Sequence, residues 1–365
     1  MPHSTTQDIE NQIFNMSSSK FNELAWDILC FQLQNLAIFQ QWHTHFPIDN
    51  QTETPVLHQL GIHFQPDFLP IQFFKSHSII IPSGNIDRDF GNLDLSNKRN
   101  SISIDTSSLL TFTSSGTTLN QPSKHPVLKP NLYESSFLIG FELRFGKPQE
   151  YCIIGLLPSY LERSGSSLIY MVEHLVKLGK PGSGFYLNEY ELLWEQVQKN
   201  EENGIKTIIF GVTFGLLLMG DWISQHRPNS SQLQHTTIIE TGGMKGRGKE
   251  LTRPELHAIL KQNWKIKSID SEYGMTELLS QAYTHPVSGR FVCPPWMKVI
   301  IQDPMDAKTY MGFGKTGRIC VMDLANIYSC AFIATDDLGK VYEDGSFEVM
   351  GRLDFSDIRG CNQLL

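Results

Sequence analysis

Between residues 151 and 264, short apolar runs alternate with longer amphipathic stretches, and few folds accommodate this alternation. Three runs have the length and β-branched content of buried strands: YCIIGLLP (151–158), KTIIFGVT (206–213) and HTTIIETGG (235–243). Three stretches carry apolar residues at helical spacing: 166–180, 188–204 with Gly204 as its C-cap candidate, and 253–264 with Pro254 in its first turn. This exchange of strand and helix favours an α/β fold with buried, largely parallel strands.

The regions on either side of this alternation have different patterns. Residues 21–43 carry apolar residues at helical spacing, which predicts helical structure with one packed face. The proline-punctuated stretch 69–84 predicts short extended pieces, and residues 291–350 are rich in predicted strands and turns. We expect three parts: a helical N-terminal extension (1–60), a large domain (61–354) and a C-terminal tail (355–365).

Composition narrows the class of protein further. A chain of 365 residues is long enough for one large domain or two packed ones. Its net charge of -8 argues against a protein that binds duplex DNA, which needs a basic face. The longest apolar stretch, 208–220, is too short to span a bilayer, and the polar, acidic start is not a secretory signal. Six cysteines without metal-ligand spacing predict reduced thiols in a cytoplasmic protein without structural zinc.

The C-terminal stretch GRLDFSDIRGCNQLL (351–365) places Cys361 beside features that increase the reactivity of a thiol. Arg359 is a cation of the kind that lowers a thiol pKa from about 8.5. Gly360 allows the backbone to come close to a bound ligand. The pattern predicts that Cys361 carries a covalent intermediate, and the alternative is a tail cysteine without a role.

Two loops have compositions that suit phosphate groups. TSSGTT (113–118) follows a β-rich run, and its glycine, hydroxyls and N–H groups can surround a phosphate, although it lacks the Walker pattern. ETGGMKGRGKELTR (240–253) brings four cations into a glycine-rich loop, which suits a polyphosphate. The alternatives are an ordinary Ser/Thr turn and a solvated charged loop.

Two further segments combine groups that recognise a nucleotide. EYGMTE (272–277) offers Tyr273, which can stack on a flat base, and Glu277, whose carboxylate suits Mg²⁺. ATDDLG (334–339) places two acids in a predicted turn, where they could accept hydrogen bonds from ribose hydroxyls. The alternatives are a helix start for the first segment and a surface turn for the second.

In this order, the segments resemble the motifs of the adenylate-forming enzymes, which include acyl-CoA synthetases, phenylacetate–CoA ligases and peptide-synthetase adenylation domains. The matches are SSGTT (114–118) to the phosphate loop, YGMTE (273–277) to the base-and-magnesium motif, ATDDL (334–338) to the ribose-binding turn and GRLD (351–354) to the hinge. Three passages resemble the LuxE group, the acyl-protein synthetases of the bacterial bioluminescence fatty-acid reductase system: 157–171, 240–257 and 356–361. The resemblance covers most of the chain from about residue 65 onward.

The resemblance implies a fold, cofactors and roles for single residues. The fold would be the N-terminal domain of an adenylate-forming enzyme, with α/β layers and mixed sheets, lacking the usual C-terminal domain. ATP would be held by Thr113, Ser114, Ser115, Gly116, Thr117, Thr118, Gly242, Gly243, Tyr273, Gly274, Thr276, Asp337 and Arg352. Among these, Tyr273 would stack on adenine, and Asp337 and Arg352 would hold the ribose. Glu277 would bind Mg²⁺, and Cys361, assisted by Arg359, would accept the acyl group.

The sequence departs from the family pattern in two places. Leu119 stands where the family phosphate loop has a glycine, which leaves open whether Lys124 contacts phosphate. Larger members carry a C-terminal domain with a lysine that assists adenylation, and this sequence ends eleven residues after Asp354. The expected replacement cation is one of three residues in the basic loop: Lys245, Arg247 or Lys249.

The activity implied is that of a long-chain-fatty-acid–protein ligase. Such an enzyme activates a fatty acid with ATP, forms acyl-AMP and transfers the acyl group to its own cysteine as a thioester, for delivery to a partner acyl reductase. An acyltransferase is a further expected partner. One alternative is an acid–CoA ligase in which free CoA accepts the acyl group. Another is a non-catalytic scaffold that binds acyl and nucleotide groups, which the Leu119 departure supports.

Overall fold

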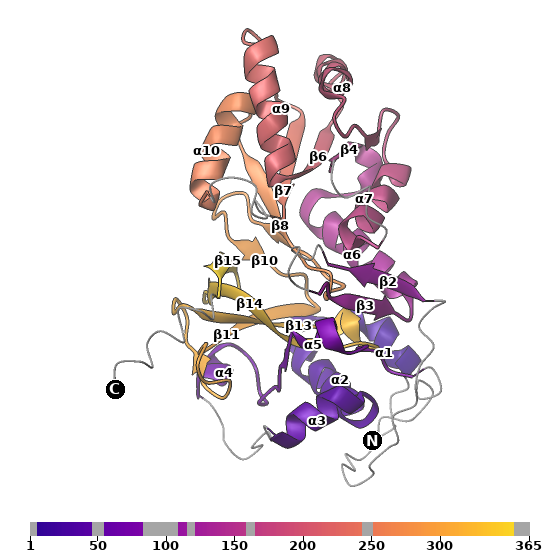
Figure 1. The fold of residues 1–365 in the computed structure, drawn as a ribbon, viewed down its shortest axis with the longest axis vertical. Helices are drawn as coiled ribbons and strands as arrows, with labels where there is room; N and C mark the ends of the chain where they lie inside the picture. The colour runs from indigo at the N-terminus through magenta and orange to yellow at the C-terminus, as the bar shows by residue number, and fades with distance from the viewer. Residues whose placement is uncertain are drawn as a thin grey trace.

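The computed structural model describes residues 6–45, 55–82, 109–114, 121–157, 165–242 and 251–353. Within these ranges a mixed sheet of 13 strands runs through the molecule, in the order β12-β11-β13-β14-β15-β10-β9-β8-β7-β6-β4-β5, with β1 paired to β14 (Figure 1). A two-stranded sheet, β2 (Leu110–Thr113) and β3 (Lys124–Val127), lies apart from it. This architecture confirms the predicted α/β class with mixed sheets.

The central alternation forms a parallel half-sheet covered on both faces. Its strands are β4 (Cys152–Leu156), β5 (Gly184–Phe185), β6 (Thr207–Val212), β7 (Thr236–Thr241) and β8 (Ile269–Tyr273). On one face pack α6 (Pro130–Phe145) and α7 (Ser167–Leu178), and on the other α8 (Tyr190–Glu202), α9 (Thr213–His226) and α10 (Arg253–Trp264). Alternate residues of β4 belong to the two separate cores, with Ile153 in one and Ile154 in the other. The strands and helices expected between 151 and 264 are therefore confirmed.

The other half of the sheet is antiparallel apart from β1, which pairs in parallel with β14, so the expectation of largely parallel strands holds for one half only. It contains β9 (Ala282–Thr284), β10 (Phe291–Val292), β11 (Met297–Gln302), β12 (Tyr310–Met311), β13 (Gly317–Asp323), β14 (Phe332–Val341) and β15 (Phe347–Arg352). Most of the connections here are too short for the crossover that a parallel pair requires. One connection includes the short 3-10 helix η4 (Leu324–Asn326).

The segment 334–339 is a strand, and the prediction of a turn there was wrong. It lies inside β14, with Asp337 paired to Arg352 of β15. The two acids that suggested a turn stand where β14 is only partly buried, next to a register shift between Leu338 and Gly339.

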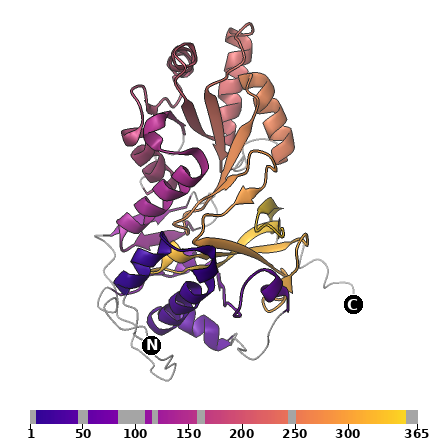
Figure 2. The ribbon, with the colours of Figure 1, turned by 180° about the vertical axis from the view of Figure 1, so that it is seen from behind.

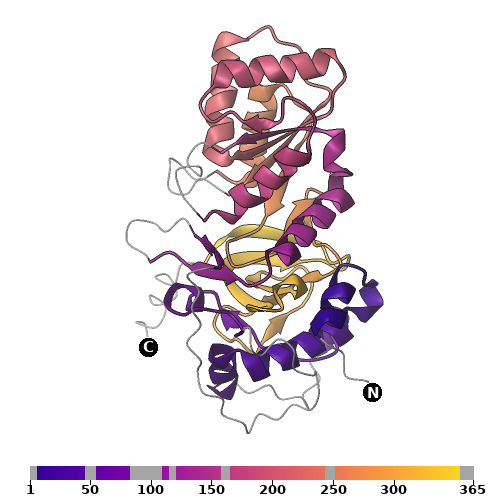
Figure 3. The same ribbon diagram turned by 90° about the vertical axis from the view of Figure 1, so that its right-hand side faces the viewer.

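The N-terminal region packs helices against the antiparallel half (Figures 2 and 3). These elements are α1 (Thr6–Ile13), η1 (Ser18–Lys20), α2 (Phe21–Asn35), α3 (Ala37–His45), α4 (Pro55–Gln59), β1 (Leu69–Pro70) and α5 (Phe73–Ser76). The pattern at 21–43 forms two helices, since Leu36 is extended between them. Buried Gln32 donates to the carbonyls of Asn326 and Ile327 and accepts from the amide of Ala331, which ties α2 to the turn after β13.

The remaining connections complete the layers. The helix α6 has no counterpart among the expected elements, and the short helix η3 (Pro148–Glu150) follows it.

No helix in the described part of the chain combines the length and apolar character needed to cross a membrane.

Candidate nucleotide site

Three of the predicted nucleotide-binding residues meet where the parallel half of the sheet joins the antiparallel half. Tyr273 is the last residue of β8, and its hydroxyl donates to Asp337 Oδ2 at 2.9 Å. The Nε of Arg352 lies 3.4 Å from Asp337 Oδ1. The site stands beyond the carboxyl ends of β7 and β8, the edge at which α/β sheets bind ligands.

Tyr273 is held in a cluster of aromatic rings. Its ring meets Phe347 edge-on at 5.3 Å between centroids and lies 5.8 Å from Phe291. Burial and the neighbouring Asp337 raise the pKa of Tyr273 well above its ordinary value, so the hydroxyl stays protonated and acts as a donor. The residue is only 8% exposed, so most of it is covered by this cluster.

Asp337 is a largely buried acid, with its side chain 14% exposed, and its partners only partly stabilise its charge. Burial raises the pKa of this carboxyl, whereas the Arg352 charge and the Tyr273 hydroxyl act in the opposite direction. The Arg352 side chain is 83% exposed, so water screens the ion pair and it contributes little to stability. The pair is therefore better suited to contacting a ligand than to stabilising the fold.

The Asp337→Asn variant tests this balance through the pH dependence of stability. A folded-state pKa above the unfolded value gives a stability contribution that is full below the unfolded pKa and is lost as pH rises through the folded pKa. Asparagine does not titrate, so the variant does not lose stability in this way as pH rises. Its free energy of unfolding, relative to that of the wild type, should therefore increase from about pH 4 upward. Urea denaturation across a pH series measures the difference.

The matched control is Asp306→Asn, because hydrogen bonds from Thr309 and Lys308 lower the pKa of that carboxyl. Its relative stability should change in the opposite direction with pH. Parallel curves for the two variants would contradict the assignment for Asp337.

Glu277 lies in the loop 274–281 that follows β8, so the expected alternative of a helix start at this segment was wrong. The residue is 4% exposed, and burial raises the pKa of its carboxyl; a hydrogen bond from Ser123 and the Arg352 and Lys75 charges act in the opposite direction. Asn326 Nδ2 donates to the Glu277 carbonyl at 2.7 Å.

This environment fits Mg²⁺. No group of three or more His, Cys, Asp or Glu residues that could hold a metal occurs in the described ranges. Mg²⁺ commonly uses one or two carboxylates together with substrate phosphates and water. A single buried carboxylate beside the predicted phosphate loop matches that mode of binding.

The base of the predicted phosphate loop lies next to Glu277. The Ser114 amide donates to the Ser123 carbonyl at 3.0 Å, and Ser114 Oγ accepts from the Ser123 amide at 2.8 Å, so these two residues join the ends of the loop. The Thr113 amide donates to the Gly165 carbonyl at 2.7 Å. Gly165 has φ +87°, and a Cβ there would lie 2.9 Å from Thr113 Oγ1, so only glycine allows this approach. Lys124 pairs with Thr113 across β2 and β3 and is exposed.

Some of the other predicted site residues lie within the described ranges, and the rest lie outside them. Gly242 follows β7 with φ +82°, and Gly274 and Thr276 lie in the loop after Tyr273. The residues outside the described ranges are Ser115, Gly116, Thr117, Thr118, Gly243, Lys245, Arg247, Lys249, Arg359 and Cys361. Their roles stay predictions.

The sequence interpretation missed two residues that contact the site from other elements. His125 Nδ1 lies 2.8 Å from the Thr276 carbonyl, and burial lowers the pKa of this imidazole to about 4, so the neutral ring donates to the carbonyl. The Arg253 guanidinium lies 4.7 Å from the centre of the Phe291 ring. Within the described ranges, its Nη1 is buried without a hydrogen-bond partner. His125 belongs to none of the sequence motifs, whereas Arg253 is one of the four cations of the basic loop 240–253 and had no individual role assigned to it.

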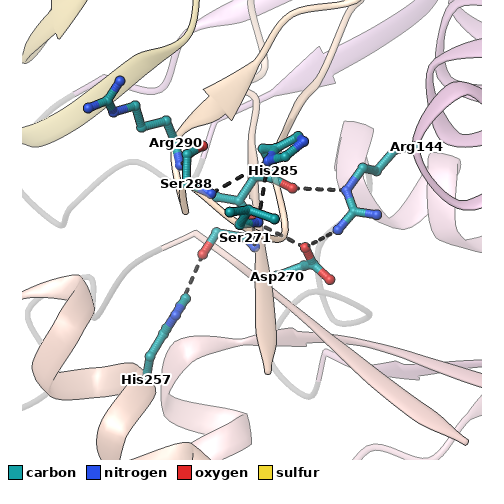
Figure 4. A network of polar contacts seen from close by, with 9 residues as sticks. Arg144, His257, Asp270, Ser271, His285, Ser288 and Arg290 are labelled. Atoms are coloured by element: carbon teal, nitrogen blue, oxygen red, sulfur yellow. Dashed lines mark hydrogen bonds and ion pairs between the residues drawn. The ribbon is translucent and has the colours of Figure 1, made fainter. Parts of the chain in front are cut away.

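A polar network fixes the strand that carries Tyr273 (Figure 4). Arg144 of α6 donates to Asp270 Oδ1 at 2.5 Å and to the Thr284 carbonyl at 2.9 Å. Ser271 binds both His257 of α10, at 3.1 Å, and Thr284 Oγ1, at 2.8 Å. The strand β8 is thereby joined to one helix on each face and to β9.

Comparison with known proteins finds solved structures with a similar fold. No protein-family model and no curated protein matches the sequence. An open conformation of 2-hydroxyisobutyryl-CoA ligase in complex with 2-HIB-AMP and CoA has a TM-score of 0.57 at 10% identity, over 94% of this chain and 77% of the ligase. An ATP-bound RpMatB-BxBclM chimera has a TM-score of 0.50 at 15% identity, over 69% of this chain and 49% of the chimera.

A long-chain-fatty-acid-CoA ligase from Archaeoglobus fulgidus has a TM-score of 0.49 at 14% identity, over 67% of this chain and 51% of the ligase. This chain matches about half the length of that ligase and of the chimera. The likeness to the 2-hydroxyisobutyryl-CoA ligase and to the chimera shows that this chain shares the fold of those two proteins.

Proposed function

We propose that the protein is an AMP-forming ligase that activates a carboxylic acid with ATP. The observation that carries this proposal is the contact of Tyr273 with Asp337 and Arg352 at the carboxyl edge of the parallel strands, next to the loop of Glu277. The ligase with the same fold holds an acyl-adenylate, which is the product this reaction would form.

Adenylation needs groups that hold the nucleotide and stabilise negative charge. A carboxylate oxygen of the acid attacks the α-phosphorus of ATP, the bond to the bridging oxygen breaks, and pyrophosphate leaves with the electron pair. In this proposal Tyr273 contacts the base, Asp337 and Arg352 hold the ribose, and Thr113 and Ser114 with the loop after them hold the phosphates. Glu277 would hold Mg²⁺, which supplies charge neutralisation at the phosphates.

We propose Cys361 as the acceptor in a second step. Its thiolate sulfur attacks the acyl carbonyl carbon, the carbon–oxygen bond to AMP breaks, AMP leaves, and a thioester forms. The chain contains six cysteines, and burial raises the pKa of each of the other five: Cys30, Cys152, Cys293, Cys320 and Cys330. Those thiols are poor nucleophiles at neutral pH.

Chain length permits Cys361 to reach the site. Leu353 donates its amide to the Asp336 carbonyl at 2.7 Å, next to the acid that would hold the ribose. Eight residues lead from Leu353 to Cys361, which span up to roughly 27 Å when extended. Arg359 would assist by favouring the thiolate.

The substrate and partner follow from the resemblance to acyl-protein synthetases. We propose a long-chain fatty acid as the substrate. We propose an acyl reductase as the protein that receives the acyl group, with an acyltransferase as a further partner. An acid–CoA ligase is the second candidate, because the ligase with the same fold was solved with CoA.

The test combines two assays on the full chain with Mg·ATP and a radiolabelled long-chain acid. Acid-dependent exchange of pyrophosphate into ATP is expected, as is protein label that neutral hydroxylamine releases. Soluble acyl-CoA that forms only when CoA is added, without protein label, would select the CoA ligase. The absence of exchange with bound ATP would contradict ligase activity and leave the scaffold alternative.

Arg253 joins Lys245, Arg247 and Lys249 as a candidate for the cation that assists adenylation. The Arg253→Ala variant is expected to slow the exchange reaction at least tenfold, because a partly buried guanidinium interacts strongly with developing charge. The control is Lys261→Ala, which removes an exposed cation from the same helix. Equal rates in the two variants would exclude Arg253 from this role.

A further inference from the structure

Asp323, the last residue of β13, is a fully buried carboxylate that binds the loop carrying Glu277. Its Oδ2 accepts from the amides of Leu279 and Ser280 at 2.8 and 3.0 Å. Its Oδ1 accepts from Ser280 Oγ at 2.5 Å and from the Ala325 amide at 3.2 Å. One side chain thus satisfies donors of the loop and of the turn that follows β13.

The hydroxyls around Asp323 have defined donor directions. The indole Nε1 of Trp296 can only donate, and it lies 2.9 Å from Ser280 Oγ and 3.1 Å from Ser136 Oγ. Ser280 gives its single proton to Asp323, so Ser136 must donate across the 2.9 Å contact between the two hydroxyls. Burial raises the pKa of Asp323 to about 6, and the hydrogen bonds that it accepts from Ser280, Leu279 and Ala325 act in the opposite direction.

A second side chain from the turn after β13 also binds the loop that carries Glu277. Asn326, three residues after Asp323, donates to the Glu277 carbonyl at 2.7 Å and is itself fully buried. His125 binds the carbonyl of Thr276 from the other side. The backbone is consequently held directly before, at and shortly after Glu277.

We propose that Asp323 and Asn326 are positioning residues that fix Glu277 for binding of the nucleotide-bound metal. This proposal rests on the function proposed above, since it assigns Glu277 to Mg²⁺. Each residue acts through the loop: Asp323 binds two of its amides and the Ser280 hydroxyl, and Asn326 binds the Glu277 carbonyl. Outer partners of a metal ligand typically change metal affinity by about 10- to 100-fold when they are replaced.

The first variant is Asp323→Asn, which keeps the shape of the side chain but turns one acceptor into a donor. The amide nitrogen would then face donors that cannot turn away, namely backbone N–H groups. The second variant, Asn326→Ala, removes the bond to Glu277 and keeps all four hydrogen bonds of Asp323. It keeps the test decisive if the first variant does not fold.

The measurement is calorimetric titration of the full chain with Mg·ATP and, separately, with ATP in EDTA. We expect Mg·ATP to bind about 10- to 100-fold more weakly in both variants, with metal-free ATP binding unchanged. The control is Asn200→Ala, which removes a buried hydrogen bond from α8 to Thr207 Oγ1 of β6, away from the loop. If Asp323 and Asn326 were purely structural, their variants would behave like the control. The affinities for Mg·ATP and for metal-free ATP would then either both change or both stay unchanged.

The outcomes separate this inference from the proposed function. Metal-dependent ATP binding in the wild type that persists unchanged in Asp323→Asn and Asn326→Ala overturns the positioning role and leaves the ligase proposal intact. A wild type that binds ATP without any effect of Mg²⁺ overturns the role of Glu277 and the positioning role together. Selective loss of the Mg²⁺ effect in the variants supports both.

Discussion

Replacing Cys361 with serine is expected to abolish acyl labelling of the protein while acid-dependent ATP–pyrophosphate exchange continues at the wild-type rate. The reason is the order of the steps, because the sulfur acts only after acyl-AMP has formed. A serine hydroxyl is almost entirely un-ionised at neutral pH and is a far weaker nucleophile toward the mixed anhydride than a thiolate. Labelled fatty acid, Mg·ATP and release by neutral hydroxylamine provide the measurement.

The control for this variant is Cys30→Ser. Burial and the neighbouring Asp27 raise the pKa of the Cys30 thiol to about 12, so it is protonated at neutral pH. Its replacement should leave both label and exchange unchanged. Undiminished label in Cys361→Ser would exclude this cysteine as the acceptor, and loss of exchange together with label would show that the residue acts before acyl transfer.

The regular part of the fold could be predicted from local pattern because each segment signals its own structure. The strands β4, β6 and β7 are continuous apolar runs, and α7, α8 and α10 have one apolar face, as expected for a covered parallel sheet. The helix α6 was missed, because its buried residues include Ser136 and Gly140 among the aromatic ones and blur the periodicity.

The candidate site could be predicted only in part, because its contacts join segments far apart along the chain. Tyr273 and Asp337 are 64 residues apart, and no spacing rule brings them together; the family resemblance did so. The turn expected at 334–339 is a strand, since a pair of acids signals exposure as readily as it signals a turn. Asp323 lies in an apolar run, and its role depends on which amide groups the fold places around it.

A second large effect is expected from Glu277→Gln, which should slow acid-dependent exchange at least 100-fold, or about 2.7 kcal/mol in the activation barrier. The variant removes the carboxylate charge that would hold Mg²⁺ and retains the shape of the side chain. Its folding stability should be equal to or above that of the wild type. Burial raises the pKa of this carboxyl, and no ion pair to it occurs within the described ranges, so the neutral amide removes an unfavourable buried charge.

The contrasting control is Glu10→Gln, at an acid that is equally inaccessible but paired. Glu10 is 7% exposed and lies 2.6 Å from Lys129 Nζ, and it also accepts from the Tyr328 hydroxyl. Removing its charge takes the ion-pair partner from the partly buried Lys129 ammonium and weakens the hydrogen bond from Tyr328, so Glu10→Gln should lower the urea midpoint and leave exchange unchanged. A group retained at a cost to stability is typical of a functional site. If Glu277→Gln instead lowered stability and kept exchange, Glu277 would be a structural acid, and the magnesium ligand would have to be sought elsewhere.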